Sequence, residues 1–311
     1  MTIANASPDA FVVASFYRFA PLAEPLAHKP ALEALCRKQG LRGILLLAHE
    51  GINGTVTGSA EAVSALHRHL LAWPEIDSLE WKTATADRHG FRRLKIRLKA
   101  EIVTMGQPDI SPSQDSGTYV EPADWNSLIS RDDIMLIDTR NRYETRLGQF
   151  TGAVDPQTDH FRQFPAWAEQ LAGTPNKPRA VAMYCTGGIR CEKATAYMRR
   201  LGFAEVYHLK GGILRYLEEI PTSESRWQGE CFVFDERVSV DHALEPGSYR
   251  LCHGCKSPLA EAEQSGPGYE PGVSCRYCHD LLTVSQRQRF RERQHQLQLA
   301  RQRGSRHFAE D

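Results

Sequence analysis

The loop Cys185-Thr-Gly-Gly-Ile-Arg190 combines a thiol, two glycines and a cation. The apolar run 180–184 before it predicts a strand, and residues 191–201 after it predict a helix. A thiol at this junction meets inward-turned backbone N–H groups and the partial positive charge of a helix N-terminus, and Arg190 adds a full charge. Such surroundings lower the pKa of a cysteine, so we expect a reactive thiolate at Cys185. A buried cysteine beside a flexible turn is the alternative.

Three further residues are expected to act together with this loop. Cys191 follows it directly, and we hypothesise that it is a resolving thiol for a persulfide or sulfenate on Cys185. The alternative is a helix residue that faces the sheet. Asp138 and Arg140 follow the short apolar run 134–137, and we expect them to brace the loop region rather than to react.

Four cysteines near the C-terminus form two C-x-x-C pairs, Cys252 with Cys255 and Cys275 with Cys278. Nineteen residues, 256–274, separate the pairs, and this spacing is typical of a four-thiolate zinc site. The intervening segment is rich in proline and glycine and offers little core, so we expect a structural zinc to hold it together. Two redox pairs or disulfides are the alternative.

Residues 88–99 contain six cations and no acid. Apolar and cationic side chains alternate in this stretch, which places the two sets on opposite faces of a strand. The cations of the alternating part are Lys95, Arg97 and Lys99, and the apolar residues are Leu94, Ile96 and Leu98. A row of cations about 7 Å apart matches phosphates along a single RNA strand, so we expect RNA to bind here. A solvated sheet face is the alternative.

A second group of polar residues lies at a strand end between glycines. His49, Glu50 and Asn53 surround Gly51, and Gly54 follows them. Because glycine allows a ligand to approach the backbone closely, we expect these three side chains to contact substrate. A hairpin turn that happens to be polar explains them equally well.

The C-terminal stretch 283–306 holds seven arginines and one acid, Glu292, which gives a net charge of +6. It is rich in glutamine, prone to form a helix and poor in apolar residues. We expect a polyanion to order it. A disordered solubilising tail is the alternative.

The predicted elements of the N-terminal third fit a ferredoxin-like sandwich. Their order, β-α-β-β-α-β, gives a sheet with two helices on one face and the other face open. The strands are expected at 11–17, 43–50, 55–57 and 92–103, and the helices at 30–39 and 59–73. From residue 134 to residue 209, strands alternate with helices and predict a parallel sheet with helices on both faces.

We therefore expect a multidomain chain of α/β and α+β class. Its parts are a ferredoxin-like (acylphosphatase-like) RNA-binding domain at 1–104, a linker at 105–118, a parallel α/β domain at 119–222, a Cys-rich zinc-ribbon-like segment at 223–282 and a basic tail at 283–311. Ligand sites in parallel sheets lie beyond the carboxyl ends of the strands, which is where Cys185 falls.

The composition is that of an ordinary globular protein, with 311 residues of which 41% are hydrophobic and 24% charged. Because 38 basic residues balance 38 acidic ones, any site for a polyanion must be local. No apolar run reaches the roughly 18 residues of a membrane helix, and residues 1–10 lack the pattern of a signal peptide. We expect a cytoplasmic protein without a membrane partner, in which Cys36 and Cys231 are core residues. Nothing in the sequence identifies which proteins it binds.

The central part of the chain resembles the rhodanese domain over residues 119–222. The resemblance is carried by the loop Cys185–Arg190, by Leu136-Ile-Asp-Thr-Arg140 upstream and by Gly211-Gly212 after the last strand. Protein tyrosine phosphatases have a related loop with five residues between cysteine and arginine. Here there are four, 186–189, which makes a smaller cradle and disfavours phosphate.

Nearly the whole chain resembles the oxygen-dependent tRNA uridine hydroxylases. The most specific pieces are Ala48-His-Glu-Gly-Ile-Asn-Gly-Thr55, Met183-Tyr-Cys-Thr-Gly-Gly-Ile-Arg-Cys-Glu-Lys193 and the terminal cysteine pairs. The resemblance implies an enzyme that converts the wobble uridine of tRNA, position 34, to 5-hydroxyuridine with molecular oxygen as co-substrate and Cys185 as the catalytic cysteine. No flavin, haem or nicotinamide motif is visible in the sequence.

Two chemical routes and two other functions stay open at this point. The Cys185 thiolate attacks C6 of uridine so that C5 reacts with oxygen, or a peroxidic or sulfenic form of Cys185 delivers the oxygen. A rhodanese-type sulfurtransferase that carries a persulfide, acting on tRNA or another acceptor, is the second function. A non-enzymatic RNA-binding module is the third.

Overall fold

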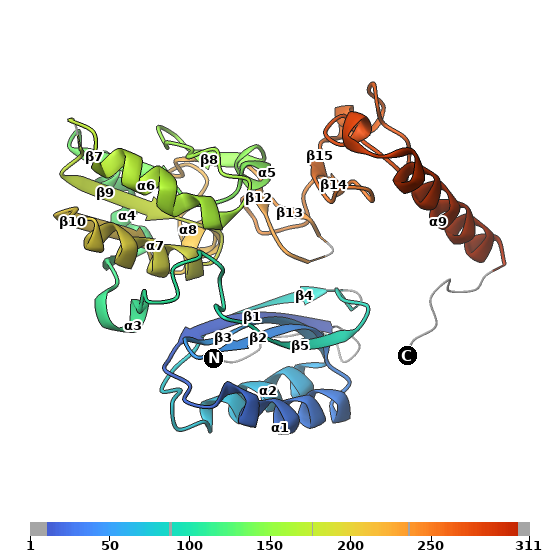
Figure 1. The fold of residues 1–311 in the computed structure, drawn as a ribbon, viewed down its shortest axis with the longest axis horizontal. Helices are drawn as coiled ribbons and strands as arrows, with labels where there is room; N and C mark the ends of the chain where they lie inside the picture. The colour runs from blue at the N-terminus through green and yellow to red at the C-terminus, as the bar shows by residue number, and fades with distance from the viewer. Residues whose placement is uncertain (1–10, 87–88, 176, 236, 304–311) are drawn as a thin grey trace.

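The computed structural model describes residues 11–86, 89–175, 177–235 and 237–303. The expectations for residues 1–10, Arg88 and 304–311 concern positions outside these ranges. Figure 1 shows an N-terminal unit at the bottom, a central α/β unit above it and a C-terminal unit that ends in a long helix at the side.

The N-terminal unit is one five-stranded sheet with both helices on the same face. Its elements are β1 (Phe11–Phe19), α1 (Pro25–Lys38), β2 (Arg42–Ala48), β3 (Gly51–Gly58), α2 (Ala60–Leu71), β4 (Glu80–Ala86) and β5 (Leu94–Leu98). The strand order is β4-β1-β3-β2-β5, and only β2 and β5 run parallel. The Ser59 hydroxyl caps α2 by accepting a hydrogen bond from the N–H of Ala62 at 3.2 Å. Helices and strands share a core that includes Leu32, Leu66 and Leu45.

The sandwich is confirmed, but the expected place of its last strand is wrong. The edge strand beside β1 is β4, which pattern reasoning missed because its sequence, Glu-Trp-Lys-Thr-Ala-Thr-Ala, has one large apolar residue. That residue, Trp81, stacks on Phe16 with ring centroids 4.7 Å apart. The expected strand 92–103 is the shorter β5, an additional strand at the opposite edge.

The alternation along β5 separates cations from the core. Ile96 is only 9% exposed and belongs to the core under the helices. Lys95 and Arg97, which alternate with it, therefore point to the other face of the sheet. Leu98 was expected in the core, but it is 40% exposed because it ends an edge strand. Lys99 lies just beyond β5 and is exposed.

The central unit is a parallel four-stranded sheet of order β6-β10-β9-β7 with helices on both faces. Its elements are β6 (Thr118–Val120), α4 (Pro122–Leu128), β7 (Ile134–Asp138), α5 (Arg142–Thr145), β8 (Gly148–Phe150), η1 (Phe161–Gln163), α6 (Phe164–Ala172), β9 (Ala180–Tyr184), α7 (Ile189–Arg200), β10 (Glu205–Leu209) and α8 (Gly212–Glu219). One core joins the sheet to α6 and α7, and the other joins it to α4 and α8. Since β9 is a central strand, its carboxyl end opens onto the middle of the unit.

The segment 105–118, expected to be a linker, is packed onto the central unit. Met105 and Ile110 are buried in the core of α6 and α7, and α3 (Pro112–Asp115) lies against α7. These contacts tie the two units together more closely than a solvated linker would.

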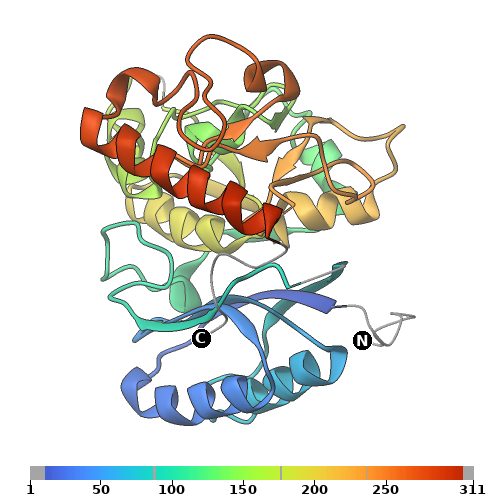
Figure 2. The ribbon, with the colours of Figure 1, turned by 90° about the vertical axis from the view of Figure 1, so that its right-hand side faces the viewer.

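The sheet face expected to be open is turned toward the central unit, as Figure 2 shows. The Lys193 ammonium donates hydrogen bonds to Glu50 at 2.6 Å and to Glu101 at 2.7 Å. The Tyr17 hydroxyl donates to Glu192 at 2.7 Å. Because all these groups are buried or nearly so, the contacts fix how the sheet faces α7.

The C-terminal unit consists of small hairpins and one long helix. Its elements are β11 (Trp227–Gly229), β12 (Cys231–Phe232), β13 (Ser239–Val240), β14 (Arg250–Leu251), β15 (Pro258–Leu259), η2 (Glu261–Gln264), η3 (His279–Leu281) and α9 (Val284–Gln302). Within the described residues the basic stretch is thus a helix, held by Arg291, which donates to Glu270 at 2.6 Å, and by Arg293, which donates to the carbonyl of Gly272 at 3.0 Å. No helix among the described residues has both the length and the apolar character needed to cross a membrane.

Candidate active site

The loop from Cys185 to Gly188 connects β9 to α7 and wraps around its own sulfur atom. Gly188 precedes α7 with φ of 105°, and its N–H donates to Cys185 Sγ at 3.1 Å. The N–H groups of Ile213 and Leu214, at the start of α8, donate to the carbonyls of Cys185 and Thr186 at 2.9 and 3.1 Å. The loop is therefore held by a hydrogen bond to its own sulfur atom and by two hydrogen bonds from α8.

Two glycines make this geometry possible. Gly212 has φ of 66°, and a Cβ atom there would lie 2.5 Å from the carbonyl oxygen of Cys185. At Gly188 a Cβ atom would lie 2.7 Å from the Tyr17 hydroxyl of the neighbouring sheet. Side chains at either position would push the loop off α8 or push the two units apart.

Cys185 has the depressed pKa expected from the sequence. Burial raises the pKa, but hydrogen bonding from Cys191, the charge of Arg190 and the N–H of Gly188 outweigh burial and lower the pKa to about 5. Cys185 is only 1% exposed to solvent, yet it is one of the residues that line a cavity. A thiolate at neutral pH is therefore held at a cavity wall.

Arg190 has a partner that the sequence did not indicate. Its guanidinium donates two hydrogen bonds to the buried carboxylate of Glu144, at 2.6 and 2.7 Å, and a weaker one to the Thr186 hydroxyl at 3.3 Å. The charge that we expected to act on Cys185 alone is thus shared with Glu144, because a buried cation requires a counter-charge. Arg190 fixes the loop as much as it attracts the thiolate.

Asp138 and Arg140 brace the loop region, as predicted. They form a fully buried ion pair at 2.6 Å. Arg140 also donates to the carbonyls of Glu144 at 3.3 Å and Gly148 at 2.6 Å. The pair therefore positions the turn that carries Glu144, the partner of Arg190.

Cys191 is buried in the core between α7 and the sheet. Its sulfur lies 3.5 Å from the hydroxyl of Thr139. Burial and the neighbouring Cys185 thiolate raise its pKa well above the ordinary value. A protonated thiol at this position stabilises the Cys185 thiolate as a donor.

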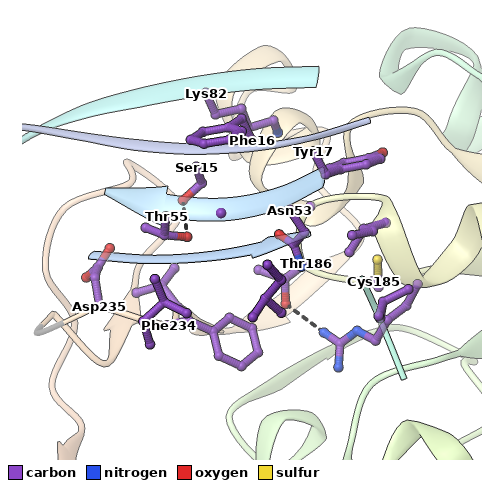
Figure 3. A pocket seen from close by; sticks show the side chains of 18 of the residues that line it. Ser15, Phe16, Tyr17, Asn53, Thr55, Lys82, Cys185, Thr186, Phe234 and Asp235 are labelled. Carbon is purple, nitrogen blue, oxygen red and sulfur yellow. Dashed lines mark hydrogen bonds between the residues drawn. The ribbon is translucent and has the colours of Figure 1, made fainter. Parts of the chain in front are cut away.

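A cavity of about 440 Å³ lies between the sheet, the Cys185 loop and the β12–β13 hairpin (Figure 3). All three units of the chain contribute walls. The lining includes Ser15, Tyr17, Ile44, Asn53, Thr55 and Lys82 from the sheet, Cys185, Thr186 and Ile189 from the loop and α7, and Val233, Phe234 and Asp235 from the hairpin. Apolar side chains dominate it, with hydroxyl, amide and amino groups at the sheet.

The residues predicted to bind substrate fall into two groups. Asn53 lines the cavity and donates to the carbonyl of Ile102 at 2.9 Å. Lys95 and Arg97 pair in register with the lining residues Ile44 and Leu46, so they extend the same sheet face beyond the cavity. Lys99 is exposed beyond the end of that row.

His49 and Glu50 lie away from the Cys185 cavity. The Nδ1 atom of His49 is 3.1 Å from the carbonyl of Leu22, and Glu50 accepts from the N–H of Ile102 at 2.6 Å as well as from Lys193. Both line a separate cavity of about 200 Å³ near the 105–118 segment. In this structure Glu50 joins the two units, and its role in substrate binding stays a prediction.

Sequence reasoning missed two groups, one that lines the cavity and one that lies behind its wall. Lys82 lines it and donates to the carbonyl of Gly211 at 2.5 Å, and burial lowers its pKa to about 8. Glu192, behind Tyr17, has a pKa raised to about 7, mainly by burial. These residues lie on strands and helices far apart in the chain, and no local spacing in the sequence connects them.

The four cysteines of the C-terminal unit converge as their spacing predicts, and we call them the zinc-ribbon cluster. Their sulfur atoms all lie within 4.8 Å of one another, with 3.9 Å between Cys252 and Cys278 and 3.7 Å between Cys255 and Cys275. Zn–S bonds of about 2.3 Å in a tetrahedron put sulfur atoms about 3.8 Å apart. The donor set and the geometry fit a closed metal site.

The fold and the site define a class of protein: a rhodanese-like unit joined to an acylphosphatase-like domain. Residues 11–102 match the family model described as UPF0176 acylphosphatase like domain, and residues 121–219 match the rhodanese-like domain model. The expected fold class is confirmed.

Similarity to curated relatives extends over almost the whole chain. It is 53% identical to a tRNA uridine(34) hydroxylase of Rhizobium leguminosarum bv. trifolii, over 99% of this chain and 98% of that one. Identity to the protein of the same name from Agrobacterium fabrum is 56%, over 96% and 95%. The one from Roseobacter denitrificans is 52% identical, over 94% and 99%. The chain belongs to the tRNA uridine(34) hydroxylase family.

Proposed function

We propose that this chain hydroxylates C5 of the wobble uridine of tRNA and that Cys185 is the reactive group. The observation that carries the proposal is a thiolate, held at neutral pH by Gly188 and Cys191, in the wall of a cavity built from all three units. The relatives with which the chain aligns over nearly its full length are named tRNA uridine(34) hydroxylases.

In the proposed reaction the Cys185 thiolate adds to C6 of uracil. The S–C6 bond forms, and the electron pair of the C5=C6 bond moves onto C5 and O4. C5 then bonds to one oxygen atom of O2, and two electrons and protons from a dithiol break the O–O bond, which leaves a hydroxyl group on C5 and releases water. The proton on C5 leaves, and the S–C6 bond breaks to restore the double bond and the thiolate. Conversion of uridine and O2 to 5-hydroxyuridine and water also consumes two electrons and two protons, which a dithiol reductant in the assay supplies.

The residues around Cys185 suit this step. The N–H of Gly188 and the thiol of Cys191 hold the sulfur as thiolate until it attacks. Lys82 carries an ammonium in the cavity wall, where it would stabilise negative charge that develops on a uracil oxygen. The apolar walls exclude water from the intermediate.

RNA binding is assigned to the cationic row beside the cavity. Lys95 and Arg97 continue the sheet face that lines it, and Lys99 follows. A tRNA backbone along this row would bring a base of the anticodon loop to the cavity. We assign α9 a supporting role in tRNA binding and the protein a place in the cytoplasm, where its substrate is found.

The zinc-ribbon cluster is assigned a structural zinc ion. Four thiolates leave no open position for substrate, so zinc there would hold the C-terminal unit together and take no part in hydroxylation.

Nucleoside analysis of tRNA tests the function. We expect tRNA from cells that lack the protein to gain 5-hydroxyuridine when incubated with the purified chain, a dithiol and oxygen, and to gain none without oxygen. Cys185→Ser should abolish the product, whereas Cys36→Ser, in a fully buried helix position remote from the cavity, should not. Sulfur in the tRNA would instead identify a sulfurtransferase, and binding without product would identify an RNA-binding module.

A further inference from the structure

We propose that Phe234 is the surface on which the wobble uracil stacks when it enters the Cys185 cavity. The inference rests on the proposed function and adds a substrate-positioning residue to it. Phe234 lies outside both matched domains, which end at residues 102 and 219, so neither domain model assigns it a role.

Phe234 is an exposed aromatic residue inside a cavity. Its side chain is 56% exposed, although phenylalanine is usually buried, and it lines the same cavity as Cys185. Figure 3 shows it across the cavity from Ser15, on the side of Thr186. An exposed ring beside a reactive thiol is a surface for a flat ligand.

The ring is held in place by other aromatic residues. Phe232 packs edge-on against Phe234 with centroids 5.1 Å apart and planes at 86°. Tyr143 of the central unit packs in the same way against Phe232 at 5.2 Å. The hairpin below the ring is closed by the N–H of Val233, which donates to the carbonyl of Val238 at 2.9 Å. The ring is thus preorganised, and its exposed part is left for a ligand.

The remaining walls match the two kinds of surface that uracil presents. Ile44 lines the cavity from the sheet and is itself 39% exposed, so apolar contact is available apart from Phe234. Asn53, Thr55 and Ser15 bring amide and hydroxyl groups to the sheet side. A pyrimidine has apolar faces and a polar edge, and the cavity offers partners for both.

A stacking residue answers an energetic requirement of the proposed reaction. Enzymes that act on a base in a folded nucleic acid take it out of its stack, which costs free energy. Stacking on an aromatic side chain offsets that cost and fixes the plane of the base. Thiolate attack on C6 comes from above or below this plane, so fixing the plane also directs the base toward Cys185.

Substitution of Phe234 separates stacking from bulk. Phe234→Leu keeps apolar volume but loses the aromatic face, and we expect kcat/KM for tRNA to fall by about five- to 150-fold. Phe234→Tyr keeps the aromatic ring and should therefore keep most of the wild-type kcat/KM. Leu26→Ala, at a side chain that is 63% exposed on α1, is the matched control and should leave kcat/KM unchanged. Because Phe234 is largely exposed, neither of its variants should change the thermal unfolding midpoint. The Arg190 guanidinium lies over the Phe234 ring, 5.9 Å from its centroid, so the rate at which iodoacetamide alkylates Cys185 is the readout for the loop. An unchanged rate in Phe234→Leu would assign the fall in kcat/KM to stacking, and a changed rate would assign it to a disturbed loop and overturn the inference.

Photocrosslinking locates the base directly. An anticodon stem–loop RNA with 4-thiouridine at the wobble position should crosslink to the peptide that contains Phe234, and less so in Phe234→Leu. Full activity of Phe234→Leu, or a crosslink elsewhere in the chain, would overturn the inference about Phe234. The proposed function would still stand in that case, provided that the wild-type chain forms 5-hydroxyuridine. A wild-type chain that forms no 5-hydroxyuridine would remove both.

Discussion

The molecule holds two clusters of cysteines whose surroundings differ in almost every respect. Cys185 and Cys191 lie six residues apart at the end of a central strand, beside a buried arginine and a cavity. The zinc-ribbon cluster spans residues 252–278 and brings four sulfur atoms within 4.8 Å of one another. The Cys185–Cys191 pair stabilises a single thiolate through hydrogen-bond donors and a positive charge, and a cavity for substrate lies beside that thiolate. The second offers four sulfur ligands to one ion.

This difference shows that the residue type alone does not determine the chemistry of a thiol. A thiolate needs compensation for its buried charge, and the Cys185 loop supplies it through N–H groups, a thiol and Arg190. In the zinc-ribbon cluster a metal ion would supply the same compensation. We therefore expect the two clusters to respond independently when either source is removed.

The largest effect is expected from metal removal. Structural zinc in a four-thiolate site is worth on the order of 10–16 kcal/mol in apparent binding free energy, so chelation should unfold residues 252–278. We expect faster amide hydrogen exchange in that segment of the full chain, and the same pattern in Cys275→Ser. The alkylation rate of Cys185 should not change.

Two results of the chelation experiment would contradict the expected independence of the two cysteine clusters. If chelation slowed alkylation of Cys185, the C-terminal cluster would belong to the reactive site. If hydrogen exchange in residues 252–278 did not respond to a strong chelator, the four cysteines would hold no metal.

The next largest effect concerns the counter-charge of Arg190. Glu144→Gln leaves a buried guanidinium without its carboxylate, and loss of one partner of a buried pair costs about 3–5 kcal/mol. Chemical denaturation should show this loss, whereas Glu33→Gln, in an exposed pair with Arg37, should cost at most about 0.5 kcal/mol.

The same pair predicts a pH dependence. Burial raises the pKa of Glu144, but Arg190 outweighs burial and holds the pKa below its ordinary value of 4.5. The contribution to stability is therefore complete above the ordinary pKa and is lost as the pH falls through the lowered one. Glu144→Gln should lack this part of the acid sensitivity. Equal acid sensitivity of variant and wild type would contradict the assignment.

How far the sequence predicted each cluster depends on how local its contacts are. The Cys185 loop is six consecutive residues between a strand and a helix, and the zinc-ribbon cluster follows from a spacing rule, so both were predicted. Glu144 pairs with a residue 46 positions away and was missed. Phe234 was missed because a single aromatic residue carries no periodic signal, and only the fold shows that it faces a cavity.

The same limit explains the error in the sheet. The alternation on β5 was visible because apolar and cationic residues differ strongly, but β4 carries polar residues and alanines with a single large apolar side chain. The sheet was therefore assigned a wrong last strand, although its helix-covered face was correct. The sequence could not show that the sheet face expected to be open forms a wall of the cavity. That placement depends on the contacts of Lys193 and Tyr17 between the two units.

A smaller effect is expected from the cationic row outside the cavity. Lys95→Glu with Arg97→Glu should weaken tRNA binding by roughly tenfold or more at moderate salt and reduce the slope of log K against log salt by about 1.4, the value for two single-strand phosphate contacts. Lys38→Glu with Arg68→Glu, exposed cations on the helix layer, is the control of equal charge. Unchanged affinity and slope in the first variant would move RNA binding to another surface, for which α9 is the next to test.

The smallest predicted effect distinguishes two roles of Cys191. A resolving thiol must itself become a thiolate, yet burial and the neighbouring Cys185 raise the pKa of Cys191 well above its ordinary value. We therefore expect it to act as a hydrogen-bond donor. Cys191→Ala should raise the pKa of Cys185, read from the pH profile of iodoacetamide alkylation, by about one unit, a free-energy change of about 1.4 kcal/mol.

Cys191→Ser keeps a donor but cannot form a disulfide, so it separates the two roles. We expect this variant to keep the alkylation midpoint of the wild-type chain, below the ordinary pKa of cysteine, and to form 5-hydroxyuridine over repeated turnovers. If Cys191→Ser stopped after one turnover while its alkylation profile stayed unchanged, Cys191 would be a resolving thiol. Cys185 and Cys191 would then work as a redox pair. The two cysteine clusters would differ in electron transfer as well as in how the charge of a thiolate is compensated.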